Sequence, residues 1–124
     1  MRIFKTKEFA RFARREGIAD KGLCDAIARA QRGIIDADLG GGLIKQRVAR
    51  LGQGRRGGYR TIIVWRAGQR CIFVYGFAKS RKADLAPKEL LAYQRIAGLL
   101  LGYDNDTLEI ALAAKELVEL TRND

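Results

Sequence analysis

The feature that most restricts how this chain can fold is a run of 45 residues, from 39 to 83, without a single Asp or Glu. The run carries eleven Lys and Arg residues, and it also contains apolar, β-forming stretches such as Ile62–Trp65 and Ile72–Tyr75. Cations interleaved with β-branched and aromatic residues favour folded strands over a disordered basic tail. We therefore expect a sheet with a cationic surface, and a surface that serves solubility alone is the alternative.

Charge is concentrated in this middle third. The whole chain has a formal net charge of +10, yet the other 79 residues hold 13 Lys and Arg against 14 acids and are nearly neutral. A concentrated positive charge favours polyanionic partners and affects association rather than fold. The sequence therefore predicts a nucleic-acid-binding protein.

Length and cysteine usage indicate one compact domain over residues 1–124. With an apolar content of 48%, the chain can bury a core without disulfide bonds or a structural metal ion. Cys24 and Cys71 have no CxxC or Cys/His spacing, so neither a metal site nor a disulfide is expected, and Cys24 should be a core residue. The amino terminus has no apolar run like that of a signal sequence, and no segment is long enough to span a bilayer. These features predict a cytoplasmic protein.

Helix signals flank residues 39–83, which we call the basic block, on both sides. Caps and apolar spacing predict helices from Thr6 to Gly17, from Asp20 to Gly33, from Asp84 and Pro87 to Gly102, and over Thr107–Ala114. Residues 116–120 fit either a helix or a final strand. Asp20 is the expected cap of the second helix.

The basic block itself alternates with period 2, which predicts strands. The expected strands are Leu43–Ala49, Tyr59–Arg66 and Arg70–Phe77, the last two joined by a tight hairpin turn. Alternation places Lys45 and Arg47 on one face of the first strand. The fold class is α+β, with a mostly antiparallel sheet of three to five strands, two N-terminal helices and C-terminal helices.

RNA cleavage by attack of a 2′-hydroxyl on the adjacent phosphate sets the chemical requirements. It needs a proton acceptor, cations for the phosphoryl oxygens and a proton donor for the leaving oxygen. The chain has no histidine and its basic block has no acid, so such chemistry would rest on Lys, Arg or Tyr without a metal ion or cofactor. Lys45 beside Arg47 is the candidate base because crowded cations disfavour a protonated amine. Arg60 and Lys79 are the other candidate catalytic residues, as phosphate-binding cations.

Other residues of the block are candidates for binding RNA without a catalytic role. The cations are predicted to contact phosphates and Tyr59 to stack on a base: Arg50, Arg55, Arg56, Tyr59, Arg81 and Lys82. The glycine-rich segment 52–58 lacks a following Lys-Ser or Lys-Thr and a following helix, which argues against a nucleotide-binding loop. Each of these cations could instead serve solubility or simple phosphate binding.

Three segments together resemble a known family. Gly41–Arg50, Gly52–Arg60 and Phe73–Lys79, with the amino-terminal FARFARREGI, resemble the RelE/ParE toxin superfamily, specifically its HigB-like branch. The resemblance covers about the first 100 residues. Residues 103–124 go beyond the minimal toxin and are a possible C-terminal extension that fills the core or adds an edge strand.

The resemblance implies a toxin that enters the ribosomal A site, cleaves mRNA there without a metal ion and inhibits translation. It also implies a cognate antitoxin, often with a helix-turn-helix DNA-binding domain, whose complex with the toxin binds operator DNA. By position, Lys45 and Arg47 match the paired basic residues of the family's first central strand. Arg60 matches the arginine of the family's GYR segment, and Lys79 matches the basic residue that ends the family's last hairpin strand.

The sequence departs from the family pattern at two positions and leaves alternatives open. Ser80 stands where some members have a second cation, and Ala86 lies near where some carry a tyrosine, so the acid and base are not identified. A ParE-like toxin that poisons DNA gyrase without nuclease activity is one alternative, although the clustered cations favour a nuclease. A non-catalytic RNA-binding or ribosome-binding protein is the other.

Overall fold

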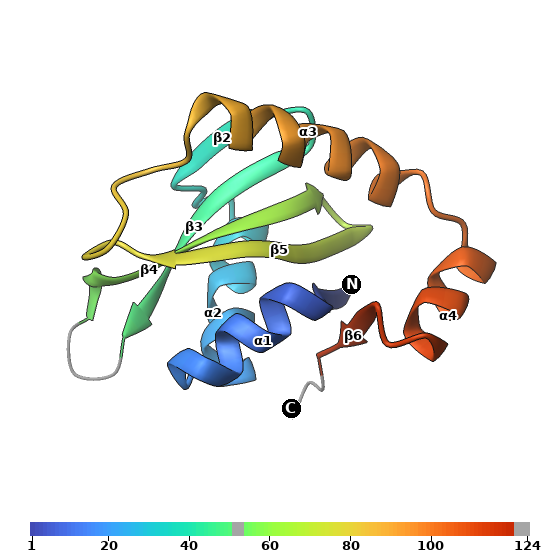
Figure 1. Cartoon of the computed structure of the whole chain (residues 1–124), viewed down its shortest axis with the longest axis horizontal. Coiled ribbons are helices and arrows are strands. Elements are labelled where there is room, and N and C mark those ends of the chain that lie inside the picture. Colours follow the sequence, from blue (N-terminus) through green and yellow to red (C-terminus); the bar gives the residue numbers. More distant parts are fainter. Residues whose placement is uncertain (51–53, 121–124) are drawn as a thin grey trace.

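The computed structural model describes residues 1–50 and 54–120, without the side chains of residues 50 and 54–56. Its elements follow one another along the chain as shown in Figure 1: β1 (Arg2–Thr6), α1 (Lys7–Glu16), α2 (Asp20–Gln31), β2 (Ala37–Gly40), β3 (Leu43–Arg50), β4 (Gly54–Arg66), β5 (Arg70–Ala78), α3 (Pro87–Leu101), α4 (Asn105–Ala113) and β6 (Leu117–Glu119). None of the described helices has the length and apolar character to cross a membrane.

The strands form one sheet in the order β2-β3-β4-β5-β1-β6. Every neighbouring pair is antiparallel except β1 and β5, which are parallel. The α+β class and the mostly antiparallel sheet are confirmed, but the described residues form six strands and not three to five. The strand β6 falls within residues 116–120, for which a final strand was one of two expectations. The additional strands β1 and β2 have 5 and 4 residues, too short to alternate recognisably in sequence.

Two helical layers cover the sheet, one on each face (Figure 1). On one face, Phe9 of α1 and Leu23 and Ile27 of α2 pack on strand residues that include Ile63 and Phe73. Cys24 packs against this core, as expected. On the other face, helices α3 and α4 cover a second core, which contains Ala97, Leu100, Leu108, Leu43, Ile62, Val64 and Ile72.

The first helix begins and ends where its sequence predicts. The Thr6 hydroxyl accepts a hydrogen bond from the Phe9 N–H at 3.2 Å, and Gly17 ends α1 in the left-handed conformation. The expected cap of α2 is wrong, because Ala19 occupies that position and Asp20 is already helical. Asp20 instead forms an ion pair with Lys5 of β1, with 2.9 Å between Nζ and Oδ1.

A β-bulge in β5 changes which residues share a face. Ile63 of β4 pairs with Phe73, but its neighbour Ile62 pairs with Tyr75, so Val74 is the additional residue. Phe73 therefore packs under α1, whereas Tyr75 and Phe77 pack with the α3 core. Simple alternation would have placed Phe73, Tyr75 and Phe77 together.

Gln46 of β3 ties the segment between α2 and β2 to the sheet. Its side chain is fully buried, donates to the carbonyl oxygens of Ala26 at 3.0 Å and Ile34 at 3.1 Å, and accepts the N–H of Asp36 at 2.7 Å. The Thr61 hydroxyl of β4 donates to the Gln46 carbonyl at 2.9 Å. One amide thus contacts three backbone groups, and two of them, the Ile34 carbonyl and the Asp36 N–H, lie outside the helices and strands.

We expect Gln46→Leu to lower the free energy of unfolding by about 2 kcal/mol, because it leaves the Ile34 carbonyl and the Asp36 N–H without this partner in the interior. Urea unfolding followed by the fluorescence of Trp65 measures the change. Gln31→Leu on the exposed surface of α2 is the matched control and should remain within about 0.5 kcal/mol of the wild type. Equal stabilities for the two variants would contradict the role of Gln46.

Candidate functional site

The register between β3 and β4 brings three predicted cations to one face of the sheet. Lys45 pairs with Ile62, and Arg47 lies directly opposite Arg60. Alternation puts all three on the face that carries Leu43 and Ile62, which α3 covers farther along the strands. Lys45 is half-buried and Arg47 is exposed. We call Lys45, Arg47 and Arg60 together the cationic site. It lies near the end of the sheet where β5 finishes and the chain leads into α3.

Arg60 is the buried member of the cationic site. It is 6% exposed, and within the described residues its Nη1 nitrogen has no hydrogen-bond partner. Burial lowers the pKa of Arg60 below its usual value, the charge of Arg47 lowers it further, and Asp36 partly opposes both effects. A buried guanidinium with an unused donor is an unfavourable arrangement for the protein alone.

Lys45 has a carboxylate partner that the sequence interpretation did not place in the site. Its Nζ lies 3.2 Å from Oδ1 of Asp84, which is 39 residues away in the chain. A hydrogen bond from the Leu85 N–H lowers the pKa of Asp84 most, Lys45 lowers it further, and partial burial opposes the shift. The basic block contains no Asp or Glu, but the segment that leads into α3 places the Asp84 carboxylate beside Lys45.

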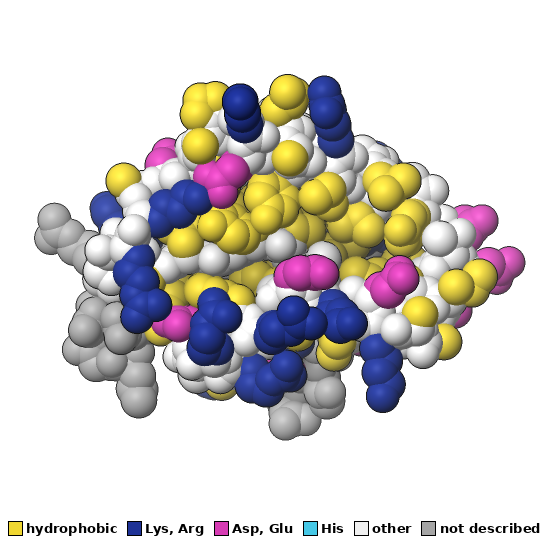
Figure 2. All heavy atoms as spheres, in the orientation of Figure 1, with side chains coloured by type: hydrophobic (Ala, Val, Ile, Leu, Met, Phe, Trp, Pro, Cys, Tyr) yellow, Lys and Arg dark blue, Asp and Glu magenta, His cyan; other side chains and the backbone are white. Residues whose placement is uncertain are grey.

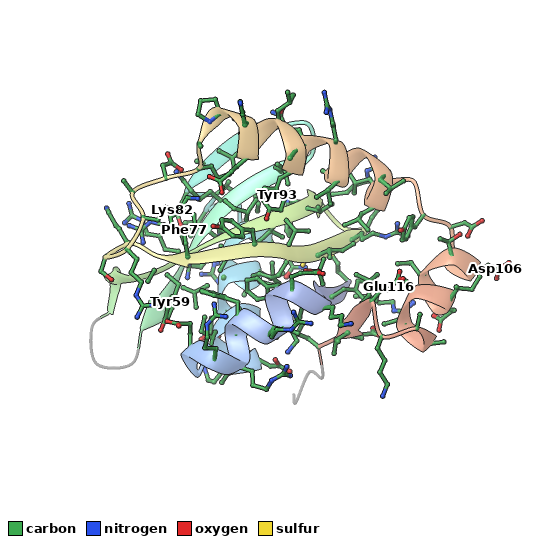
Figure 3. All side chains as sticks on the ribbon, in the orientation of Figure 1. Tyr59, Phe77, Lys82, Tyr93, Asp106 and Glu116 are labelled. Atoms are coloured by element: carbon green, nitrogen blue, oxygen red, sulfur yellow. The ribbon has the colours of Figure 1, made fainter. Side chains whose placement is uncertain are left out.

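Lys82 is engaged in an ion pair, although the sequence predicted it to bind RNA. Its Nζ lies 2.6 Å from both carboxylate oxygens of Glu89 and 3.3 Å from the hydroxyl of Tyr75. Tyr75 in turn stacks on Tyr93 of α3, with ring centroids 5.2 Å apart. Figure 3 shows Lys82, Phe77 and Tyr93 together on the α3 side of β5. The ion pair fixes the start of α3 beside the cationic site.

Tyr59 lies on the opposite face of the sheet. It is 3% exposed, its hydroxyl donates to the Glu16 carbonyl at 3.3 Å, and its ring meets Phe12 of α1 edge-on. Figure 3 shows it on the α1 side of the sheet. The ring of Tyr59 is therefore buried in this structure and is not exposed for the predicted stacking on a base. Its neighbour Arg60 faces α3, so alternation alone excludes Tyr59 from the cationic face.

The remaining predicted cations lie near the same end of the sheet or outside the description. Lys79 follows β5 directly, is exposed, and donates its N–H to the Gly58 carbonyl at 3.3 Å. Arg81 is exposed in the turn that follows. The side chains of Arg50, Arg55 and Arg56 lie outside the described residues. Among the described residues there is no group of three or more His, Cys, Asp or Glu side chains placed to hold a metal ion.

Comparison with known families decides what kind of protein carries this site. A family model described as the RelE toxin of the RelE/RelB toxin–antitoxin system matches residues 1–120. The chain belongs to this family. It is a toxin of a toxin–antitoxin system, and its partner is a cognate antitoxin. A search of curated proteins finds no match.

Arg60 of this RelE toxin should reduce stability, because its buried charge has an unused donor and lies opposite Arg47. We expect Arg60→Met to raise the free energy of unfolding by about 1 kcal/mol. Urea unfolding measures this change. Arg66→Met, at the exposed other end of β4, is the control and should change stability by less than about 0.5 kcal/mol. Destabilisation by Arg60→Met would show that Arg60 supports the fold.

The Lys82–Glu89 pair should make stability depend on pH. The hydrogen bond from Lys82 lowers the pKa of Glu89, so this pair stabilises the fold above the usual glutamate pKa of about 4.3 and the contribution is lost as pH falls through the folded-state value. We expect Glu89→Gln to lower the melting temperature at pH 7 but to differ little from the wild type near pH 3. In a Lys82→Met background the same change should have a smaller effect at pH 7, and the remainder comes from the hydrogen bond of the Ala86 N–H to Glu89.

Proposed function

We propose that this RelE toxin is a ribosome-dependent endoribonuclease of the HigB-like branch, which cleaves mRNA in the ribosomal A site without a metal ion and so inhibits translation in the cytoplasm. The observation that carries the proposal is Arg60, buried with an unused donor directly opposite Arg47 and on the face that also holds Lys45. A gyrase inhibitor has no need for three cations directed at one phosphate.

In the proposed reaction, each cation stabilises the phosphate in a different way. Arg60 donates to a phosphoryl oxygen from a site of low polarity, where a charged hydrogen bond is stronger than in water. Arg47 is exposed and opposite, so it attracts the RNA backbone and binds a second oxygen. Lys79, at the end of the neighbouring strand, adds charge to the same end of the sheet.

Lys45 and Asp84 supply the proton transfers in this scheme. The Asp84 carboxylate accepts the proton of the 2′-hydroxyl as its oxygen bonds to phosphorus, and the bond from phosphorus to the 5′-oxygen breaks to leave a 2′,3′-cyclic phosphate. The Lys45 ammonium donates a proton to the leaving 5′-oxygen. The ion pair places both groups beside Arg47 and Arg60, and this assignment differs from the expectation that Lys45 is the base.

The proposal also names the partners that the function requires. The substrate is mRNA held on a translating ribosome, which presents the phosphate to the cationic site. The cognate antitoxin carries a helix-turn-helix DNA-binding domain, and the toxin contacts operator DNA only within that complex.

Primer extension on a reporter mRNA after brief induction tests the nuclease. The wild type should give discrete cuts within translated sequence, and the cuts should disappear when translation is blocked before induction. Arg60→Ala should reduce the cleavage rate about 100-fold, because it removes a preorganised donor to the transition state. Lys45→Ala and Asp84→Asn should also reduce it strongly. Arg66→Ala on the same strand should stay within about twofold of the wild type.

Two results would contradict the nuclease and indicate other activities. Growth arrest with intact mRNA would point to a ParE-like toxin, and a supercoiling assay with purified gyrase would then show inhibition. No arrest and no cleavage, together with ribosome binding by the purified protein, would indicate a non-catalytic RNA-binding protein.

A further inference from the structure

The edge of β3 loses its strand partner before it reaches Arg47. β2 pairs with β3 over Leu43–Lys45, where Ala37 lies opposite Lys45. In the described part of the chain, no strand lies on this side of β3 beyond Lys45. Backbone N–H and C=O groups along a free edge need partners from outside the sheet. Arg47, two residues farther along, lies on this free edge.

Two side chains from different segments bind the backbone of Arg47. Its N–H donates to Oδ2 of Asp36 at 2.7 Å. Its carbonyl oxygen accepts a hydrogen bond from Nη2 of Arg29, which lies in the last turn of α2. The two side chains therefore take the place of a neighbouring strand at this position. We call Asp36 and Arg29 together the Arg47 clamp.

These hydrogen bonds identify the kind of pair that Arg47 forms with Arg60. The N–H and C=O of one strand residue point to the same side, so those of Arg47 point away from β4. Arg47 and Arg60 therefore form a non-hydrogen-bonded pair, in which the Cα atoms are about 4.5 Å apart and the side chains come closest. Like charges directly opposite each other are destabilising, so this pair needs support from its surroundings.

Asp36 supplies a negative charge to the pair without occupying either guanidinium. Burial and the charge of Arg47 lower the pKa of Arg60, and the charge of Asp36 opposes both effects. Within the described residues, the Asp36 carboxylate accepts the Arg47 N–H and forms no ion pair with the guanidinium of Arg47 or Arg60. The Nη1 nitrogen of Arg60, which has no partner among these residues, is left for an anion.

The backbone of Asp36 is itself held by the core. Its N–H donates to Oε1 of Gln46 at 2.7 Å, and Gln46 is fully buried in β3. The preceding residue, Ile35, packs against the core under α2. The carboxylate that binds Arg47 thus projects from a fixed segment, and support of this kind is what holds a functional side chain in one geometry.

The sign of its charge argues against a role for Asp36 in attracting RNA. The chain has a net charge of +10, and Figure 2 shows Lys and Arg side chains along α1 and around the end of the sheet where β5 leads into α3. An acid in such surroundings repels a phosphate backbone and weakens its association. Removal of an acid without a positioning role should therefore leave phosphate binding unchanged or strengthen it.

We propose that Asp36 and Arg29 are positioning residues of the cationic site, which hold the backbone of Arg47 so that Arg47 and Arg60 bind the same phosphate. Both act through Arg47 and are not catalytic residues. The inference rests on the proposed function for the source of that phosphate, which is mRNA. The joint binding of one phosphate by the two arginines is a separate property that can be measured without cleavage.

Nuclear magnetic resonance of the full-length toxin, titrated with inorganic phosphate, tests the clamp in the absence of ribosomes. In the wild type, the side-chain Nε–H signals of Arg47 and Arg60 should shift together with one dissociation constant. In Asp36→Ala, the Arg60 signal should still shift, whereas the Arg47 signal should no longer follow it. The backbone amide of Arg47 should also exchange with solvent about tenfold faster, because it has lost its acceptor.

Two further variants separate positioning from charge and from general stability. Asp36→Asn removes the charge but keeps an oxygen that can accept the Arg47 N–H, so it should restore the joint response to phosphate. Asp38→Ala is the matched control, because Asp38 is an exposed acid whose carboxylate also accepts a backbone N–H, that of Gly40 at 2.9 Å. It should behave as the wild type in every measurement, and circular dichroism confirms that all variants are folded.

Cleavage of mRNA on programmed ribosomes gives the functional readout. Asp36→Ala should lower kcat about tenfold, because a displaced phosphate-binding group no longer fits the transition state, and should leave KM unchanged or lower. Arg29→Met should also lower kcat. Arg32→Met removes the same charge from the exposed end of α2 and should stay within about twofold of the wild type.

The outcomes distinguish a failure of this inference from a failure of the proposed function. Joint shifts of Arg47 and Arg60 in Asp36→Ala, or a kcat equal to that of the wild type, would overturn the inference. A wild type that leaves mRNA intact would contradict the nuclease, and the phosphate titration would then decide alone. Joint shifts that are lost in Asp36→Ala would support the clamp, and independent shifts in the wild type would overturn it.

Discussion

The pairing of β3 with β4, with Arg47 opposite Arg60, is the constraint on which the rest of this structure depends. Side chains alternate along a strand, so a slip of one residue would move Lys45 and Arg47 into the core beneath α2. The same slip would remove Gln46 from the three backbone groups that it contacts. The burial of Ile44 and Val48 and the hydrogen bonds of Gln46 therefore fix the cations on the other face.

The remaining parts of the site come from two departures from regular structure. The bulge at Val74 turns Tyr75 and Phe77 toward α3, where they line the region beside Arg60. The irregular segment before Pro87 then places Asp84 against Lys45, and Glu89 on α3 holds Lys82. These contacts join β3, β5 and the beginning of α3 around one end of the sheet.

The site keeps a feature that does not favour folding. Arg60 is buried and one of its donors has no partner among the described residues, and a second guanidinium lies across the strand pair. A guanidinium of this kind is completed when an anion reaches its donor, and this is the physical basis for the proposal that a phosphate binds there.

Much of this arrangement could be predicted from local sequence alone. Thr6 and Gly17 bound α1, period 2 identifies β3, β4 and β5, and alternation groups Lys45 with Arg47. The sequence could not identify β1 and β2 and left β6 open between a strand and a helix, since strands of three to five residues depend on the strand with which they pair. It also could not pair Lys45 with Asp84 or Lys82 with Glu89, or find the bulge at Val74. Periodicity and capping depend on neighbouring residues and are written in the sequence, whereas a free edge, a buried charge and an ion pair across 39 residues depend on which distant segments meet.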